Sequence, residues 1–545
     1  MSTEVHTTDD ASTTKHEKPR RKPHQQGLAV AFTAMMLSQM LISLDQTILA
    51  TALPRIASRF QAFSLQGWVA TAFILAQTVF ILFVGQMTRI YPAKWILVNS
   101  IAIFEIGSLL IAGRAVSGVG AAGIYVSLVQ VLTQVTRLED RPRLFGVFGA
   151  TVAVSSLEIC QSTPPLAPAD ILDDRWCFFI NLPLGVVSIT GVTLLLKASP
   201  PLGADPTKRS WADVLEQTRR MDFVGAILSA GAVTCLILAL QWGGNTKAWN
   251  DKAVIITFVF AGALTAVYVA WEKYMGERAM IPTVIFKTLG VWAILIYCML
   301  TRFSMLLFSY YIPIFYQAAR HRTATESGID LVPLMLSLVL TLIIAGQIVG
   351  KTGHVWPFLV VGPIILAIGS GLLYTLTPTT SSAKLIGFQI LAGAGTGMGM
   401  QNAMMALQTV FRDEPRLIGQ ASSMGSFTGF LGGTIGLGIA EPVFASELTK
   451  KLLVYAPEAP VQVVKESPVA IYTELEPEMI AGVVRSYSEA LRVVYVIGVP
   501  VAGIGLLLAT FLIPKSKLIQ KGPPGRGASA DEKKNSDLEE KVESG

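Results

Sequence analysis

Apolar segments of about twenty residues recur along almost the whole chain, from near residue 28 to near residue 513. A segment of ~20 apolar residues can span the hydrocarbon core of a bilayer as an α-helix, which satisfies its own backbone hydrogen bonds. The chain is 52% apolar and only 15% charged, a composition that excludes an ordinary soluble enzyme. The sequence therefore predicts an all-α polytopic membrane protein.

Flanking charges and Gly/Pro breaks divide the apolar stretches into about fourteen predicted spans. With a cytosolic N-terminus, the cytosolic segments carry more than twice as many lysines and arginines as the outer segments, in agreement with the positive-inside rule. Both termini are therefore predicted to be cytosolic, and the polar residues 1–26 and 514–545 to be disordered tails. Residues 444–490 are predicted to form an extracytosolic loop. The spans are placed near residues 28–49, 68–88, 95–112, 115–135, 144–161, 176–196, 222–241, 253–271, 291–316, 329–349, 356–376, 384–410, 417–443 and 493–513.

Ionisable side chains lie inside several of these spans, beginning with Asp45 in the first. At the bilayer centre such a group costs on the order of 2.5 kcal/mol or more unless it faces a polar interior. Asp45, Glu105 and Arg114 are therefore predicted to line a substrate or proton path, or to pair with one another. For Arg302 and Asp330, an interhelical ion pair or a position near the membrane interface is the favoured interpretation.

Uncharged polar side chains accompany these ionisable groups. On helices that face a central cavity they would bind an amphipathic solute without demanding a fixed charge. The candidates for such a cavity are Gln39, Gln46, Thr47, Gln77, Gln130, Gln401 and Asn402.

Two glycine-containing motifs resemble nucleotide-binding sequences without their context. Residues 118–123 match the GxGxxG pattern inside an apolar segment with no preceding strand, so these glycines are predicted to let helices approach closely. Residues 346–352 resemble a phosphate-binding loop but are one residue short, with Ala345 where the first glycine belongs. The four cysteines form no CxxC or Cys/His cluster. We therefore predict no metal, no cofactor and no nucleic-acid partner, and a membrane-embedded enzyme is the weakest class of function.

Short motifs along the chain point to a known family. They are residues 44–48 (LDQTI), 52–56 (ALPRI), 67–73 (GWVATAF), 114–120 (RAVSGVG), 176–183 (WCFFINLP), 240–244 (LQWGG), 311–317 (YIPIFYQ) and 327–329 (SGI). In these segments the chain resembles the fourteen-span drug:proton antiporter branch of the major facilitator superfamily. The likeness covers roughly residues 27–515 and is greatest for fungal members, which export small amphipathic compounds such as toxins and secondary metabolites.

The resemblance implies two six-helix bundles, over residues 27–196 and 291–513, with two extra spans in the linker 197–290. Substrate would bind between the bundles near mid-membrane, and rocking of one bundle against the other would alternate access. Asp45 would be the proton site, and Arg114 would assist proton coupling. Glu105 is a further candidate for proton coupling. Such proteins usually work as monomers in the plasma membrane, with a small molecule and protons as partners.

The chain departs from the family pattern at three places. Arg89 and Pro92 stand where the loop between spans two and three has an acidic residue and a glycine, so its gating charge pair is predicted to be absent or rewired. Spans three and four are joined with almost no loop, which places Arg114 towards the outer membrane edge. Residues 156–174 carry prolines and aspartates in place of the Gly-Pro-x-x-Gly-Gly signature of span five. A frameshift or a misassigned splice boundary would produce such a stretch.

The sequence thus predicts a secondary active transporter that exports small amphipathic organic compounds by proton antiport with alternating access. Two alternatives stay open. One is uptake on the same fold, for example of an iron chelate or a nutrient, because the altered span-five motif removes the local indication of direction. The other is a non-transporting, degenerate member, because spans three to five depart from the pattern.

Overall fold

The computed structural model describes residues 32–43, 45, 66–108, 113–136, 140–149, 181–201, 210–244, 247–286, 288–466, 468, 470–473 and 475–515. Over these ranges the regular structure is helical, and the one pairing of extended backbone is an isolated bridge between Gly243 and Lys247. The prediction of an all-α membrane protein is confirmed for this part of the chain.

The helices coincide with the apolar stretches of the sequence. In chain order they are Phe32–Ser43, α2 (Gln66–Met87), α3 (Ala93–Ser108), α4 (Arg114–Val135), residues 141–149, α7 (Asn181–Leu195), α8 (Trp211–Arg219), α9 (Phe223–Trp242), α10 (Lys252–Met275), η3 (Gly276–Arg278), η4 (Thr283–Phe286), α11 (Leu289–Arg320), α12 (Ala324–Asp330), α13 (Val332–Thr352), α14 (Trp356–Tyr374), α15 (Ser382–Val410), α16 (Pro415–Tyr455), α17 (Val461–Glu466), α18 (Ala470–Thr473), α19 (Pro477–Val496) and α20 (Gly498–Phe511).

Eight of the described helical stretches are long and apolar enough to cross a membrane, and shorter apolar helices such as Asn181–Leu195 accompany them. The total of about fourteen spans stays a prediction, because most of the predicted span 144–161 lies outside the described residues.

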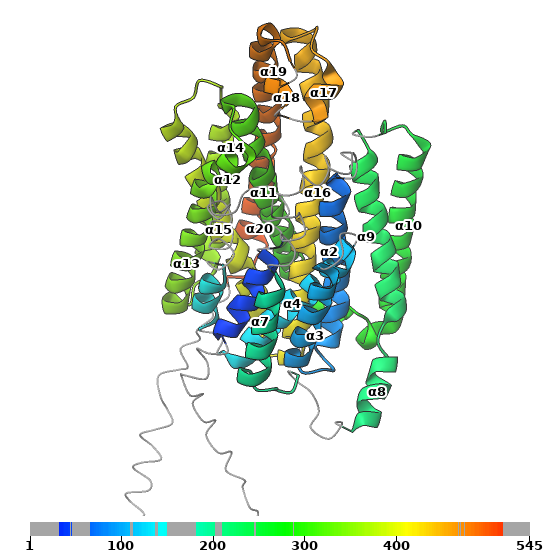
Figure 1. Ribbon diagram of the computed structural model, residues 1–545. Coiled ribbons are helices and arrows are strands. Elements are labelled where there is room, and N and C mark those ends of the chain that lie inside the picture. The colour runs from blue at the N-terminus through cyan, green and yellow to red at the C-terminus, as the bar shows by residue number, and fades with distance from the viewer. Residues whose placement is uncertain are drawn as a thin grey trace, which may run out of the picture.

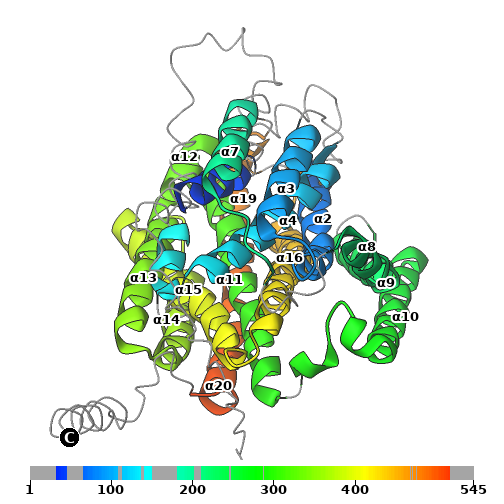
Figure 2. The same ribbon diagram turned by 90° about the horizontal axis from the view of Figure 1, so that it is seen from below.

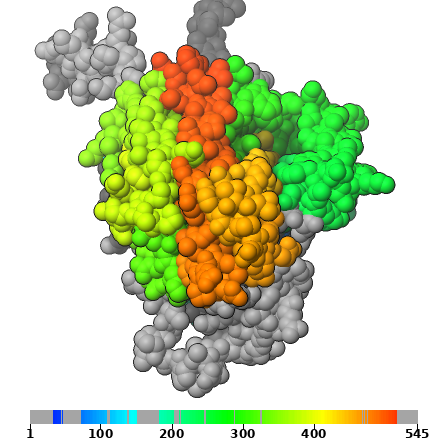
Figure 3. Space-filling view, turned by 90° about the horizontal axis from the view of Figure 1, so that it is seen from above, coloured from blue at the N-terminus to red at the C-terminus, as the bar shows by residue number. Residues whose placement is uncertain are grey.

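The helices form one large bundle with a separate pair at its side (Figure 1). Helices α2, α3, α4 and α7 lie together in the lower part, and α11, α13 to α16, α19 and α20 form the rest of the bundle. Seen from below, α9 and α10 stand beside this body with α8 next to them (Figure 2). Seen from above, a hollow lies between the pair α9 and α10 and the helices of the large bundle (Figure 3). Ile227 and Val259 of the pair are 72% and 64% exposed, as apolar side chains facing lipid are.

Glycines set the close packing of α4 against its neighbours. A Cβ atom on Gly120 would lie 2.5 Å from the backbone nitrogen of Phe104 in α3, and one on Gly118 would overlap the carbonyl oxygen of Phe73 in α2. Gly123 faces Ser100 of α3 in the same way. The interpretation of this GxGxxG motif as a helix-packing motif is confirmed, because all three glycines lie inside α4 against other helices.

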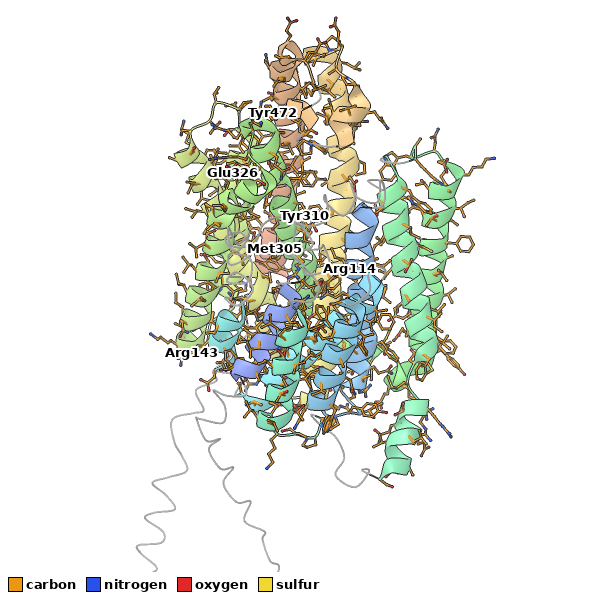
Figure 4. All side chains as sticks on the ribbon, viewed as in Figure 1. Arg114, Arg143, Met305, Tyr310, Glu326 and Tyr472 are labelled. Atoms are coloured by element: carbon orange, nitrogen blue, oxygen red, sulfur yellow. The ribbon has the colours of Figure 1, made fainter. Side chains whose placement is uncertain are left out.

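Residues 444–490, from the last turns of α16 onwards, form a small helical subdomain, which we call the outer cap after its predicted extracytosolic position. Here α16 continues to Tyr455, well past the predicted end of its span, and α17, α18 and the start of α19 fold back on it. Figures 1 and 4 show the cap rising above the other helices, with Tyr472 inside it. The Tyr472 hydroxyl donates to the Ala318 carbonyl at 2.8 Å, and its ring stacks on His321. The predicted loop is therefore largely helical, because buried side chains such as Leu448 give it a core of its own.

Candidate functional site

The structure brings Asp45 and Arg114 together. Arg114 is the first residue of α4, and Asp45 is a helical residue two positions after Ser43. The Arg114 Nη1 atom donates to Asp45 Oδ2 at 2.7 Å, and the two side chains are only 5% and 1% exposed. Each charge therefore compensates the other, and replacing one partner by an apolar side chain would leave the other charge buried without a partner, at a cost of about 3–5 kcal/mol.

An aromatic ring holds the other side of the guanidinium. The Arg114 Cζ atom lies 4.5 Å from the centroid of the Phe73 ring in α2, a cation–π contact. Arg114 Nε is buried and has no hydrogen-bond partner. Figure 4 places Arg114 about half-way along the α9–α10 pair. Arg114 is buried between helices, 4% exposed, and its position towards the outer membrane edge stays a prediction.

A second carboxyl group lies in the same half of the molecule. Glu105 of α3 is buried, and both of its carboxyl oxygens lack a hydrogen-bond partner. Gly185 of α7 makes room for it, since a Cβ atom there would overlap Glu105 Oε1. Asn181 and Ser188 lie on the same side of α7 as Gly185, one turn before and one turn after it, and their buried polar side-chain atoms are also without partners. Glu105 thus packs against the polar side of α7, and no cation among the described residues pairs with it.

The polar side chains predicted to line a cavity lie in different surroundings. Gln39 and Gln77 are buried with unpartnered Oε1 atoms. Gln130 faces Gly419 of α16 at a tight helix contact. Two of the candidates, Gln46 and Thr47, lie outside the described residues.

The two candidates in α15 differ from each other. Gln401 lines a central cavity, and its Nε2 atom has no partner. Asn402 is buried and donates to the Met398 carbonyl within its own helix at 2.7 Å. Of the two, Gln401 is the one whose amide is available to a solute.

The central cavity lies where α4 and helix 141–149 face α11, α15 and α16. Its volume is about 50 Å³, enough for a few atoms or water molecules but far below the ~300 Å³ of a typical ligand pocket. A drug-sized solute therefore requires the helices to separate. The lining residues are Tyr125, Val129, Phe145, Phe148, Cys298, Arg302, Met400, Gln401, Met404, Gly425, Ser426, Gly429 and Phe430.

Four aromatic residues, Tyr125, Phe145, Phe148 and Phe430, contribute to this lining. None of them was predicted from the sequence as a site residue. Tyr125 of α4 meets Phe430 of α16 edge to face, with ring centroids 5.6 Å apart, and Phe145 meets Phe148 likewise at 6.4 Å. In an apolar span an aromatic residue that faces a cavity has the same hydropathy as one that faces lipid. Only the arrangement of these rings on three helices, α4, residues 141–149 and α16, identifies them.

Below the cavity the bundle is tightly closed. A Cβ atom on Gly346 of α13 would overlap the Pro142 carbonyl oxygen, and one on Gly85 of α2 would lie 2.5 Å from Ser423 Oγ in α16. Arg141, the residue before Pro142, donates to Gln408 Oε1 of α15 at 3.1 Å. Gly346 belongs to the motif that resembles a phosphate-binding loop. It lies inside α13 against a neighbouring helix, and the motif therefore forms no loop.

The loop between α2 and α3 is held by neutral hydrogen bonds. Gln86 donates to the Arg278 carbonyl at 3.1 Å and accepts from the backbone nitrogen of Asp222 at 3.3 Å. The hydroxyls of Tyr91 and Thr218 are 2.7 Å apart. Burial lowers the pKa of the Arg89 guanidinium, and the nearby Arg416 adds to this effect. Glu277, just after α10, attracts the Arg89 guanidinium and opposes this lowering. The described contacts of this region run to the linker before α9 and to the segment after α10, and the absent or rewired charge pair stays a prediction.

Comparison with known proteins gives a consistent match. Residues 35–437 match the model of the Major Facilitator Superfamily. The MFS-type transporter astH of Aspergillus oryzae is 33% identical over 504 residues, covering 90% of this chain and 87% of the relative. The aspyridones efflux protein of Neocamarosporium betae is 32% identical over 507 residues, covering 90% and 88%. The MFS-type efflux pump MFS1 of Trichophyton rubrum is 33% identical over 493 residues, covering 88% and 90%.

Solved structures show the same fold at low sequence identity. The human organic anion transporter MFSD10 is 12% identical with a TM-score of 0.57, covering 90% of this chain and 100% of that one. The proton:xylose symporter XylE is 12% identical with a TM-score of 0.56, covering 91% and 97%. The family model, the relatives and the helical fold agree, and this chain is a membrane transporter that belongs to the major facilitator superfamily.

Proposed function

We propose that this transporter exports small amphipathic organic compounds, such as a toxin, a secondary metabolite or a drug, by proton antiport. The observation that carries the proposal is the buried pair of Asp45 and Arg114, 2.7 Å apart. Three of the similar proteins are named for efflux: the aspyridones efflux protein, the efflux pump MFS1 and the efflux pump aunC of Aspergillus niger. Export is therefore the direction that these relatives support.

Proton coupling follows from the chemistry of the pair. A proton on Asp45 removes the charge that holds Arg114, so the guanidinium loses its strongest contact and the helices that carry the two residues become free to separate. Loss of the proton restores the attraction. Glu105 is a second proton-accepting group, because an ionised carboxylate without a hydrogen-bond donor is costly in the membrane and a proton removes that cost.

Substrate would enter the central cavity when the two halves of the bundle part at one end. The tight glycine contacts at the lower end, around Gly346 and Gly85, support a state closed at the predicted cytosolic side. Alternating access would open this end and close the other. We further propose that the protein acts as a monomer in the plasma membrane with both termini in the cytosol, which the distribution of lysines and arginines supports.

The test is transport by the purified protein in liposomes. With an acidic interior, protons leave down their gradient, so an antiporter should accumulate amphipathic dyes inside, and a proton ionophore should abolish the accumulation. Accumulation only with an acidic exterior would instead identify a proton symporter, the uptake alternative. Absence of both gradient-driven transport and counterflow for a broad panel of amphipathic dyes would contradict transport altogether.

Replacement of Gly346 by valine should favour the state that is open at the lower end. The valine side chain would overlap Pro142, and overpacking of this kind costs about 1–3 kcal/mol. The ratio of open to closed molecules should therefore rise by about fivefold or more. Spin labels on Asp140 and Thr352, in a background without cysteine, would report the distance across this end. Gly387→Val is the matched control, because a Cβ atom there meets nothing within 4 Å. Unchanged distances in the Gly346 variant would contradict the closing role.

A further inference from the structure

Arg302 is a cation in the central cavity that has no anionic partner among the residues that the structure describes. It lies on α11, and its Cζ atom is 4.4 Å from the centroid of the Phe430 ring. Its Nη1 atom contacts the Met400 sulfur at 3.9 Å, and its Nε atom has no hydrogen-bond partner. Among the described residues no carboxylate lies within 4.0 Å of this guanidinium. The interhelical ion pair predicted for Arg302 is therefore wrong in this state, whereas Asp330 does pair with Arg322 at 3.2 Å.

Arg302 differs from the buried arginines Arg114 and Arg141 in the groups that it meets. Arg114 has the Asp45 carboxylate, and Arg141 has an amide oxygen and the Thr133 carbonyl, at 3.1 and 2.9 Å. A thioether is only a weak acceptor, so Arg302 has planar N–H donors with no strong acceptor to receive them. A charged group in this position is costly unless something outside the chain satisfies it.

The surroundings of Arg302 suit a flat apolar molecule. Tyr125 and Phe148 come from the N-terminal half, and Phe430 and Met404 come from the C-terminal half. Aromatic faces stack on planar bodies, and methionine side chains adapt to different shapes. The cavity thus combines an apolar, aromatic lining with one positive charge.

We propose that the central cavity recognises amphipathic organic anions, with Arg302 binding an acidic group of the substrate while the aromatic residues contact its apolar body. This rests on the proposed export function and names its substrate class. A guanidinium presents two parallel N–H donors to a carboxylate, a geometry that a lysine does not reproduce. The present volume of about 50 Å³ accommodates a carboxyl group, and the aromatic body would be admitted as the two halves separate.

Matched pairs of aromatic probes test this subsite. Each pair has the same ring system of one, two or three fused rings, and ends in a carboxylate, as in 1-naphthylacetate, or in an alcohol of similar size, as in 2-(1-naphthyl)ethanol. Binding is measured by calorimetry on the full-length protein in lipid nanodiscs at neutral pH without a proton gradient, with empty nanodiscs subtracted. We expect the protein to bind the acid of at least one pair about tenfold more tightly than the alcohol.

Variants of Arg302 test whether this residue causes the preference for the acid over the alcohol. Arg302→Gln should weaken binding of the acid by about tenfold or more and leave the alcohol within about twofold, while Arg302→Lys should keep part of the preference. Arg485→Gln is the matched control, because Arg485, like Arg302, lies over an aromatic ring, that of Tyr455 at 4.2 Å, but in the outer cap. It should bind both probes as the unchanged protein does.

Two outcomes would overturn the anion subsite: no preference for the acid in any pair, including no binding of any probe, or an acid preference that Arg302→Gln leaves intact. These results are separate from the proposed function. A protein that exports neutral or cationic dyes in liposomes but shows no acid preference keeps the export proposal and loses this one. If the protein binds the acid in a way that depends on Arg302 but transports nothing, the anion subsite is kept and the export proposal is lost.

Discussion

Asp45→Asn should abolish gradient-driven transport while the protein stays folded and inserted. The asparagine side chain still offers an oxygen to Arg114 Nη1 in place of the Asp45 Oδ2 atom at 2.7 Å, but it cannot take up and release a proton. In liposomes with an acidic interior, dye accumulation should fall to the level of empty liposomes. Exchange of dye without a gradient should continue, because exchange needs the two conformations but no proton transfer.

The control for this variant is the same substitution at a different ion pair. Asp330→Asn removes a carboxylate that pairs with Arg322 at 3.2 Å, where the arginine is 48% exposed. Exposed pairs contribute about 0–1 kcal/mol, so this variant should transport at close to the normal rate. Size-exclusion profiles and melting temperatures of both variants would establish that each is folded. Normal gradient-driven transport by Asp45→Asn would end the assignment of Asp45 as the coupling site.

Gly120→Leu should prevent the formation of a stable protein. The new Cβ atom would lie 2.5 Å from the Phe104 nitrogen, and three further carbon atoms would have to fit between α3 and α4. Because the obstacle is backbone and not a flexible side chain, the two helices would have to move apart. We expect a loss of about 3 kcal/mol or more, at the upper end of overpacking effects, seen as loss of the monodisperse species after purification.

The matched control places the same residue on a helix surface. Gly262 of α10 also lies inside an apolar helix, but a Cβ atom there meets nothing within 4 Å. Gly262→Leu should therefore purify with a yield and melting temperature close to those of the unchanged protein. Equal behaviour of the two leucine variants would show that close contact between α3 and α4 is not required for the fold. Separation of the α3–α4 contact would also disturb Arg114, which begins α4.

The sequence predicted several local features correctly. Hydropathy located the apolar helices, because a membrane span must be long, apolar and internally hydrogen-bonded. The glycine motif in α4 was correctly assigned to helix packing, because it lies inside an apolar segment with no strand before it. Helix ends were harder to predict. The end of α16 lies at Tyr455 and not near residue 443, because contacts within the outer cap, and not hydropathy, decide where that helix stops.

Side-chain partners were predicted less well, as Arg302 shows. Asp45, Arg114 and Arg302 were all recognisable from sequence as costly charges within spans. Their contacts differ. Arg114 binds a carboxylate 69 positions away in the chain, whereas Arg302 contacts a phenyl ring and a thioether. Nothing in the local sequence distinguishes these two cases.

The sequence by itself determined the helical membrane class, the short list of intramembrane charges and the glycines on α4, because each follows from the composition of a single segment. The tertiary structure alone decided which charges pair, which aromatic rings line the cavity and where the bundle is closed. These depend on the rotation and depth of each helix relative to its neighbours. An apolar helix has nearly the same hydropathy on every face in lipid, so only packing determines what a given side chain meets.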